Sequence, residues 1–202
     1  MDKKHEMIGH PLGLFILFFT EMWERFSYYG MRALLILTLV AATESTNPGF
    51  GLSNGDALLL YGYYTGLVYA ATLFGGLIAD NLLGQRKSII LGGTLMAIGQ
   101  YTLFAATPHS MSLFYVGLGF IIAGNGLFKP NISAIVGDLY PQGDARRDGG
   151  FTIFYMGINL GAFIAPLVTS SLGESDAFGW RYGYLAAGIG MTLSVVIQLL
   201  FE

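Results

Sequence analysis

The chain of 202 residues contains no cysteine, which excludes disulfides and thiolate metal sites. Charged residues are also scarce: Asp, Glu, Lys and Arg make up 11% of the chain, whereas about 25% is usual in soluble domains. The sequence lacks an H-E-x-x-H zinc motif, a G-x-S-x-G nucleophile motif and a P-loop. Its formal net charge of -3 gives no indication of a nucleic-acid partner. We therefore expect no enzyme activity, no cofactor and no metal site.

Apolar residues dominate what is present. They make up 53% of the chain, and the mean hydropathy is +0.58. Glycine is abundant, at 29 residues, which suits close helix–helix contact in lipid. The polar residues 1–11 lack the basic region and short apolar run of a cleavable signal peptide, so we expect none. This composition predicts an integral membrane protein.

Six segments are long enough to cross a bilayer, for which a helix needs about 20 mostly apolar residues. Turn-forming residues separate them. The predicted spans are residues 12–42, 56–82, 88–106, 112–136, 149–172 and 182–201. A soluble helical protein would need polar stripes on nearly every helix, and the second and third segments lack them. The sequence therefore predicts an all-α membrane protein, with residues 1–202 forming one bundle of six transmembrane helices. Because the last span ends beside the final residue, we expect half of a larger transporter.

Basic residues outside the spans predict the orientation of the bundle. Six of them share one side of the predicted topology: Lys3, Lys4, Arg86, Lys87, Arg146 and Arg147. The opposite side has only Arg181. We therefore expect both termini to lie on the cytoplasmic side of the membrane.

Five formal charges lie inside the predicted spans, where each costs roughly 2.5–3.5 kcal/mol near the bilayer centre. They are Glu21, Glu24, Arg25 and Arg32 in the first span and Lys129 in the fourth. Together with Tyr28, the charges at positions 21, 25 and 32 fall within about 60° of one another on a helix, since each residue advances about 100°. This polar stripe must face a cavity or neighbouring helices. The alternative to a functional site is a permanent network of salt bridges that holds the bundle together.

The sum of these charges indicates a possible chemistry. With both glutamates ionised the five groups sum to +1, which a carboxylate on a substrate would neutralise. Protonation of one glutamate raises the sum to +2 and frees a cation from its partner. Proton binding and anion binding should then favour each other, as a proton symporter requires.

Other polar residues in the spans are further candidates. Asn125, Lys129 and Ser133 recur every four residues, so they share one side of a helix that Pro130 should bend. A lysine that reaches the membrane surface is the alternative for Lys129. Tyr64 and Tyr69 lie deep in the second span, and Tyr155 and Asn159 share a face of the fifth; each could contact a substrate. Tyr61 and Tyr63 are better explained as part of an aromatic belt or of the core.

Two further patterns predict contacts between helices. Gly62-x-x-x-Gly66 and Gly157-x-x-x-Gly161 are typical of tight packing surfaces. Asp80 stands at a cytoplasmic helix end near the cations Arg86 and Lys87, where it could form a latch that opens and closes during a rocking motion. The alternative for Asp80 is a plain interfacial charge.

Four of these stretches resemble one known family. Residues 21–30 match E-x-x-E-R-F-x-Y-Y-G, and residues 154–161 match F-Y-x-x-I-N-x-G. Residues 126–131 resemble the fourth-helix segment of the same family, and residues 76–87 resemble a loop motif of its superfamily, with Asn81 where a basic residue is common. The chain thus resembles the N-terminal six-helix half of a proton-coupled oligopeptide transporter, a branch of the major facilitator superfamily.

This resemblance implies the symport of di- and tripeptides with protons across the cytoplasmic membrane. It implies a proton-coupling cluster at Glu21, Glu24 and Arg25, and a positive patch for the peptide carboxylate at Arg25, Arg32 and Lys129. Positions that resemble pocket-lining residues are Tyr29, Tyr64, Tyr69, Tyr155 and Asn159. The implied gating latch is Asp80 with Arg86. A second six-helix half, expected as the partner of this one, would hold the amino end of the peptide.

Two alternatives stay open. The same fold and positive patch could transport nitrate or another small anion. The six helices could also be a non-transporting structural module, in which case the charged stripe should be fully paired and dry.

Overall fold

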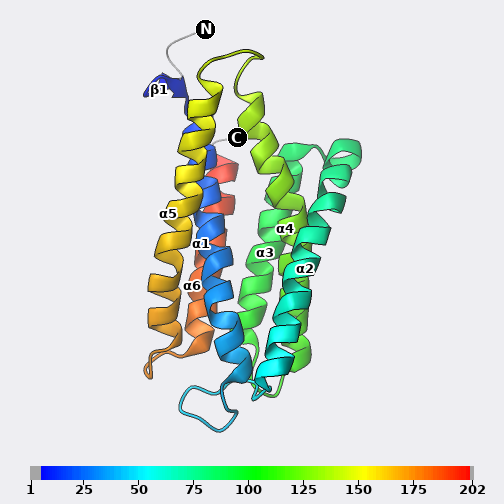
Figure 1. Cartoon of the computed structure of the whole chain (residues 1–202), viewed down its shortest axis with the longest axis vertical. Helices are drawn as coiled ribbons and strands as arrows, with labels where there is room; N and C mark the ends of the chain where they lie inside the picture. Colours follow the sequence, from blue (N-terminus) through cyan, green and yellow to red (C-terminus); the bar gives the residue numbers. More distant parts are fainter. Residues whose placement is uncertain (1–5, 201–202) are drawn as a thin grey trace.

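The computed structural model describes residues 6–200, which form a bundle of long helices preceded by a short β-hairpin (Figure 1). The helices are α1 (Leu12–Val40), α2 (Asn54–Ile78), α3 (Gln85–Ala105), α4 (Met111–Asp138), α5 (Arg147–Gly173) and α6 (Trp180–Leu200). One turn of π-helix, η2 (Ala79–Leu83), extends α2, and the strands β1 (Glu6–Met7) and β2 (His10–Pro11) pair antiparallel. Helices occupy all six segments predicted as spans, with ends that shift by a few residues. The predicted end at Phe201 and the cations Lys3 and Lys4 lie outside the described residues.

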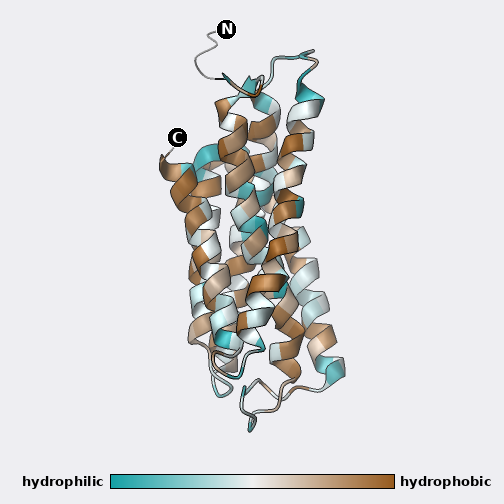
Figure 2. Ribbon diagram, turned by 90° about the vertical axis from the view of Figure 1, so that its left-hand side faces the viewer, coloured by the Kyte–Doolittle hydropathy of each residue, from teal (hydrophilic) through white to brown (hydrophobic). Residues whose placement is uncertain are grey.

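Five of the described helices, α2 to α6, are long and apolar enough to cross a membrane. The helix α1 has comparable length, at 29 residues, but it carries the four charges predicted for the first span. In Figure 1, α1 lies beside α5 and α6, against which it packs, and three of its charged residues, Glu21, Glu24 and Arg25, are buried. Figure 2 shows hydrophobic residues along all the visible helices and hydrophilic residues mainly at the two ends, with a further group midway.

The helices pack as two groups of three. In one group α1 lies against α5 and α6, and in the other α4 lies against α2 and α3. Contact between α3 and α6 joins the groups, whereas α1 touches α2 and α4 only sparsely. The charged face of α1 lies at this loosely packed junction.

Glycines set the closest helix crossings. A methyl group on Gly75 of α2 would overlap the carbonyl oxygen of Gly126 in α4, so the two backbones are in direct contact there. Gly157 and Gly161 of α5 meet the backbone of α1 in the same way, which confirms the predicted packing surface on α5. The prediction for Gly62 and Gly66 is wrong, because a methyl group at either position would meet nothing within 4 Å in the described chain.

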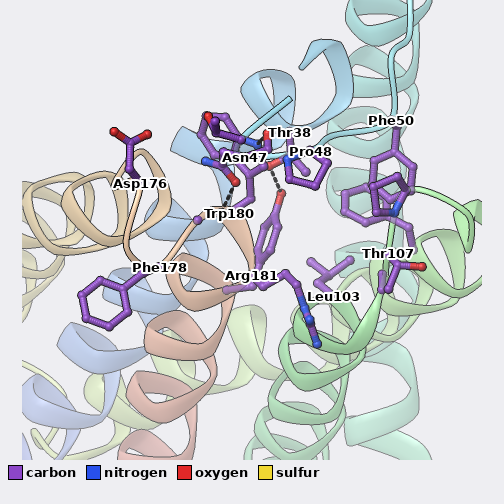
Figure 3. A pocket seen from close by; sticks show the side chains of 16 residues that line it. Thr38, Asn47, Pro48, Phe50, Leu103, Thr107, Asp176, Phe178, Trp180 and Arg181 are labelled. Atoms are coloured by element: carbon purple, nitrogen blue, oxygen red, sulfur yellow. Dashed lines mark hydrogen bonds between the residues drawn. The ribbon is translucent and has the colours of Figure 1, made fainter. Parts of the chain in front are cut away.

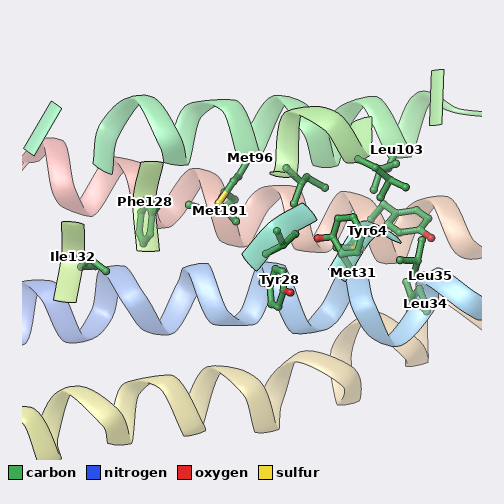
Figure 4. Packing of buried hydrophobic residues seen from close by; sticks show 14 of the residues in the cluster. Tyr28, Met31, Leu34, Leu35, Tyr64, Met96, Leu103, Phe128, Ile132 and Met191 are labelled. Carbon is green, nitrogen blue, oxygen red and sulfur yellow. The ribbon is translucent and has the colours of Figure 1, made fainter. Parts of the chain in front are cut away.

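The apolar core contacts α1 along most of its length. Figure 4 shows Met31 and Leu34 of α1 in the same cluster as Met96, Phe128 and Met191 from α3, α4 and α6. All five side chains are buried. The core therefore fixes the rotation of α1 about its axis and turns its charged face toward α2 and α4.

Candidate functional site

The charged stripe of α1 is buried and largely paired. Glu21 and Glu24 are 0% exposed, and Arg25 is 6% exposed. The Nε atom of Arg25 lies 3.2 Å from Oε1 of Glu21, and it also donates to Glu24. Across the junction, Nζ of Lys129 lies 2.6 Å from the same Glu21 oxygen. One carboxylate thus holds two cations that come from two different helices.

The helix α4 supplies the other side of this cluster. Asn125 is buried, and its Nδ2 atom donates to Oε1 of Glu24 at 3.4 Å. Pro130 has no N–H to donate to the carbonyl of Gly126, four residues earlier. That carbonyl instead faces Gly75 of α2. The Gly-Pro segment therefore lets α4 approach α2 closely while Asn125 and Lys129 face α1.

Of the three cations inside the spans, Arg32 alone has no carboxylate partner among residues 6–200. Its Nε atom donates to the hydroxyl of Tyr61 at 2.9 Å, and its Nη2 atom donates to the same oxygen. Its guanidinium carbon also lies 5.2 Å from the ring centre of Tyr61 and 5.7 Å from that of Tyr28. Arg32 therefore keeps its positive charge. The sequence pattern assigned Tyr61 to an aromatic belt or to the core and did not predict this contact. The contact joins α1 and α2, and the spacing of residues along α2 alone cannot predict it.

These groups surround a cavity of about 490 Å³. Its walls come from α1, α2 and α4, with one residue of α5. The lining residues are Arg25, Tyr28, Tyr29, Arg32, Val68, Tyr69, Thr72, Asn125, Lys129, Pro130, Ser133 and Ile158. The structure thus brings together five of the predicted substrate-binding residues, namely Arg25, Tyr29, Arg32, Tyr69 and Lys129. It also places Asn125, Lys129 and Ser133 on one side of α4, as their spacing predicts.

Three predicted binding residues lie elsewhere. Tyr64 is 2% exposed and lines a separate, mainly apolar hollow between α2 and α4. Tyr155 and Asn159 are exposed on α5, and the Asn159 amide donates to the backbone oxygen of Tyr155 at 3.0 Å. The reason is rotation about the helix axis: the Gly157 face of α5 packs on α1, so residues two positions away point to the other side.

The predicted latch is not formed as an internal ion pair. Asp80 lies exposed on η2 and Arg86 lies exposed in the first turn of α3, and no salt bridge joins them in the described part of the chain. The turn between them requires Gly84, whose φ is 77°. Both side chains line an open hollow at this end of the bundle.

The two ends of the bundle differ in how they are held. At one end Asn47 bonds to the backbone oxygen of Gly173 at 2.6 Å, to the backbone N–H of Trp180 at 3.0 Å and to its indole N–H at 3.0 Å. A hollow of about 330 Å³ lies beside this clamp (Figure 3). Thr38 and Tyr184 line it and bond to each other at 2.9 Å. These polar groups satisfy one another, so we interpret this hollow as a structural feature.

At the other end, the β-hairpin is tied to the loop between α4 and α5. Arg146 donates to Glu6 at 3.0 Å, to the backbone oxygen of Gly9 at 3.1 Å and to both oxygens of Asp144. The hydrogen bonds from Arg146 lower the pKa of Asp144 to about 2. His10 bonds to the hydroxyl of Tyr140 at 2.8 Å, and burial raises the pKa of that tyrosine.

The comparisons with known proteins agree on one family. The sequence model of the POT family matches residues 86–200. The chain is 48% identical over 94% of its length to the peptide transporter YePEPT of Yersinia enterocolitica subsp. palearctica, and 47% identical over 93% to a di-/tripeptide transporter of Lactococcus lactis subsp. lactis. It spans only 36% and 37% of the lengths of these two relatives.

Solved structures give the same picture. A crystal structure of a peptide transporter POT in complex with sulfate has a TM-score of 0.90 and 44% identity, and the match covers 96% of this chain and 38% of that one. A POT family transporter in complex with 5-aminolevulinic acid has a TM-score of 0.90 and 43% identity, covering 98% and 39%.

Proposed function

The chain belongs to the POT family, and from this premise we propose that it forms the N-terminal half of a proton-coupled symporter of di- and tripeptides. The family resemblance of the sequence is thereby confirmed, and the chain is an integral membrane protein of a transporter family. One observation carries the proposal: three cations line one cavity, and two of them pair with buried carboxylates of α1 that lie behind the cavity wall. The charges of these five groups sum to +1. A transporter function accounts for this cavity better than an enzyme activity.

Protonation would work through the shared carboxylate. When Glu21 is ionised, it holds Lys129 at 2.6 Å and Arg25 at 3.2 Å. A proton on Glu21 or Glu24 removes one negative charge from a buried site, where an unpaired charge is costly. Lys129 can then bind a peptide carboxylate together with Arg32. Proton and peptide binding thus stabilise each other, which is the coupling that a symporter needs.

The remaining residues take roles according to their place. Tyr29 and Tyr69 would contact the peptide from the cavity wall. Tyr155 and Asn159 would contact it from the exposed face of α5. Tyr64 would reach a peptide only if α2 moved relative to α4, because it is 2% exposed.

The proposal also includes the latch, the single bundle and the orientation predicted from the sequence. Asp80 and Arg86 would form their latch with the second six-helix half or in another state of the transport cycle. Residues 1–202 form one bundle in the cytoplasmic membrane, with the N-terminus in the cytoplasm. The hairpin, η2 and the α4–α5 loop lie at one end of the bundle, as this topology requires (Figure 1).

The proposal is tested in proteoliposomes that contain the complete transporter. Glu24→Gln should abolish dipeptide accumulation driven by an imposed pH gradient, because it removes one of the two carboxylates on which the coupling depends, while peptide exchange without a gradient remains measurable. Glu44→Gln, in the exposed loop after α1, is the matched control. Undiminished accumulation by the Glu24 variant would contradict the coupling role.

A small inorganic anion is the second candidate cargo, since the three cations on the cavity wall would bind nitrate as well as a carboxylate. Competition of dipeptide and nitrate against one labelled dipeptide separates the two. Displacement by nitrate at concentrations similar to those of dipeptide would favour the small anion.

A further inference from the structure

We propose that Tyr61 is a positioning residue for substrate carboxylates, because it fixes the orientation of Arg32. This inference rests on the proposed function of the cavity. Tyr61 lies on α2, half-buried against the apolar core, and it is not among the residues that line the cavity. Arg32 does line the cavity. Tyr61 is therefore placed to act on a ligand through Arg32 rather than by direct contact.

The geometry of the contact supports this role. Two N–H groups of Arg32, on Nε and Nη2, converge on the single hydroxyl oxygen of Tyr61. The rings of Tyr61 and Tyr28 both lie within cation–π distance of the same guanidinium. The guanidinium is planar, so two bonds from one edge fix the direction of its remaining donors.

The chemistry of the partner is the second argument. Tyr61 offers a neutral oxygen, so it orders Arg32 without cancelling the positive charge. A carboxylate at this place would compete with the substrate, as Glu21 does for Lys129. Because the guanidinium is already ordered, a carboxylate that binds it does not have to restrict a long, flexible side chain.

Tyr61→Phe removes the hydroxyl and keeps the ring, so it tests the hydrogen bonds alone. In the complete transporter we expect KM for a dipeptide with a free carboxyl group to rise about five- to tenfold, the size of effect that loss of one ordinary hydrogen bond produces. The maximal rate should not change. KM for the same dipeptide with an amidated C-terminus should change less than about twofold, because it lacks the charge that Arg32 binds.

Tyr63→Phe is the matched control, since Tyr63 lies two residues along α2, is 66% exposed and contacts a different hollow. It should leave both KM values unchanged. A second test combines Tyr61→Phe with Arg32→Lys. If Tyr61 acts through Arg32, the double variant should be no worse than Arg32→Lys alone.

The outcomes separate this inference from the function on which it rests. If Arg32→Lys weakens free-carboxyl peptides selectively while Tyr61→Phe does not, the positioning role is overturned and the proposed site survives. If Tyr61→Phe lowers the maximal rate equally for both peptides with no change in KM, Tyr61 has only a packing role. If neither variant distinguishes the two peptides, the carboxylate site itself is wrong, and the inference fails with it.

Discussion

At the residue scale, Lys129 and Arg32 line the same cavity but have different partners. Lys129 shares the Glu21 carboxylate with Arg25, whereas Arg32 has a neutral phenol as its partner. A carboxylate could therefore bind Arg32 at any protonation state, and could bind Lys129 only after Glu21 releases it. The two cations would then serve as the constant and the proton-dependent parts of one binding site.

This difference predicts the effect of Lys129→Ala. Uptake of a dipeptide with a free carboxyl group should weaken by about tenfold or more in KM, since a charge-assisted contact is lost. The amidated peptide should be affected less. The measurement is inhibition of labelled dipeptide uptake by each peptide. Ser133→Ala is a useful control, because Ser133 lies one turn further along the same face of α4 and carries no charge. Equal losses for both peptides would contradict direct contact with the carboxylate.

At the scale of elements, the crossing of α2 and α4 depends on single glycines. Gly75 meets a backbone carbonyl, which cannot move aside as a side chain can. Gly62 lies on the same helix and meets nothing within 4 Å. A glycine is therefore required for close packing at position 75, whereas position 62 has space for a side chain.

Gly75→Ala should consequently lower the thermal stability of the protein in detergent, by about 1–3 kcal/mol in unfolding free energy, since the helices must separate to admit a methyl group. Gly62→Ala should leave the stability unchanged or raise it slightly, because alanine favours a helix more than glycine does. Fluorescence-detected unfolding of both variants measures the difference. Equal effects would mean that the crossing is not as close as described.

The hairpin before α1 is the second element with a testable contact. The pKa of Asp144 is lowered from 3.8 to about 2 by Arg146. A carboxyl group with a lowered pKa in the folded protein stabilises it above its ordinary pKa, and this contribution is lost as the pH falls through the lowered value. The contact between Asp144 and Arg146 should therefore persist down to about pH 4 and weaken toward about pH 2.

Spin labels on cysteines introduced at Ile8 and Gln142 would report this change, in a chain that has no native cysteine. The distance distribution should be narrow at pH 7 and should broaden at pH 2, where the carboxylates around Arg146 have lost their charge. Asp144→Asn should broaden it already at pH 5, whereas Asp148→Asn, exposed in the first turn of α5, should not. A distribution that stays narrow in Asp144→Asn would show that other contacts hold the hairpin.

At the scale of the whole molecule, the described residues form a cation-lined cavity between the two groups of helices and expose extensive apolar surface elsewhere. The helix α5 exposes Phe163 and Leu167, and α2 exposes Leu73 and Phe74. Among the five long apolar helices, these two have the smallest share of buried residues in their apolar stretch. The share is 17% for α2 and 22% for α5. These faces suit contact with lipid or with the second half of a transporter.

A water-filled transport cavity and a dry structural bundle predict different reactivities for a cysteine introduced on the cavity wall. A cysteine at Ser133, on the cavity wall, should react with a water-soluble maleimide when the transporter is in a bilayer. A cysteine at Leu193, which is 38% exposed on α6, should react slowly because lipid covers it. Saturating dipeptide should slow the reaction at Ser133 alone. Equally slow reaction at both positions would favour the structural module.

The sequence by itself determined the number of helices and which faces carry charge. Both properties are local: hydropathy over about 20 residues predicts a span, and the helical repeat predicts that Glu21, Arg25 and Arg32 share a face. The same repeat predicted the common side of Asn125, Lys129 and Ser133. The short motifs of α1 and α5 were enough to predict the family.

Only the tertiary structure decided which faces meet. Spacing along α2 could not show that Tyr61 bonds to Arg32, that Tyr64 is enclosed, or that Gly62 is open while Gly75 is in contact. Each of these outcomes depends on how far a helix is rotated about its axis against its neighbours. That rotation is fixed by the packing of the whole apolar core and of the glycine crossings, to which every helix contributes.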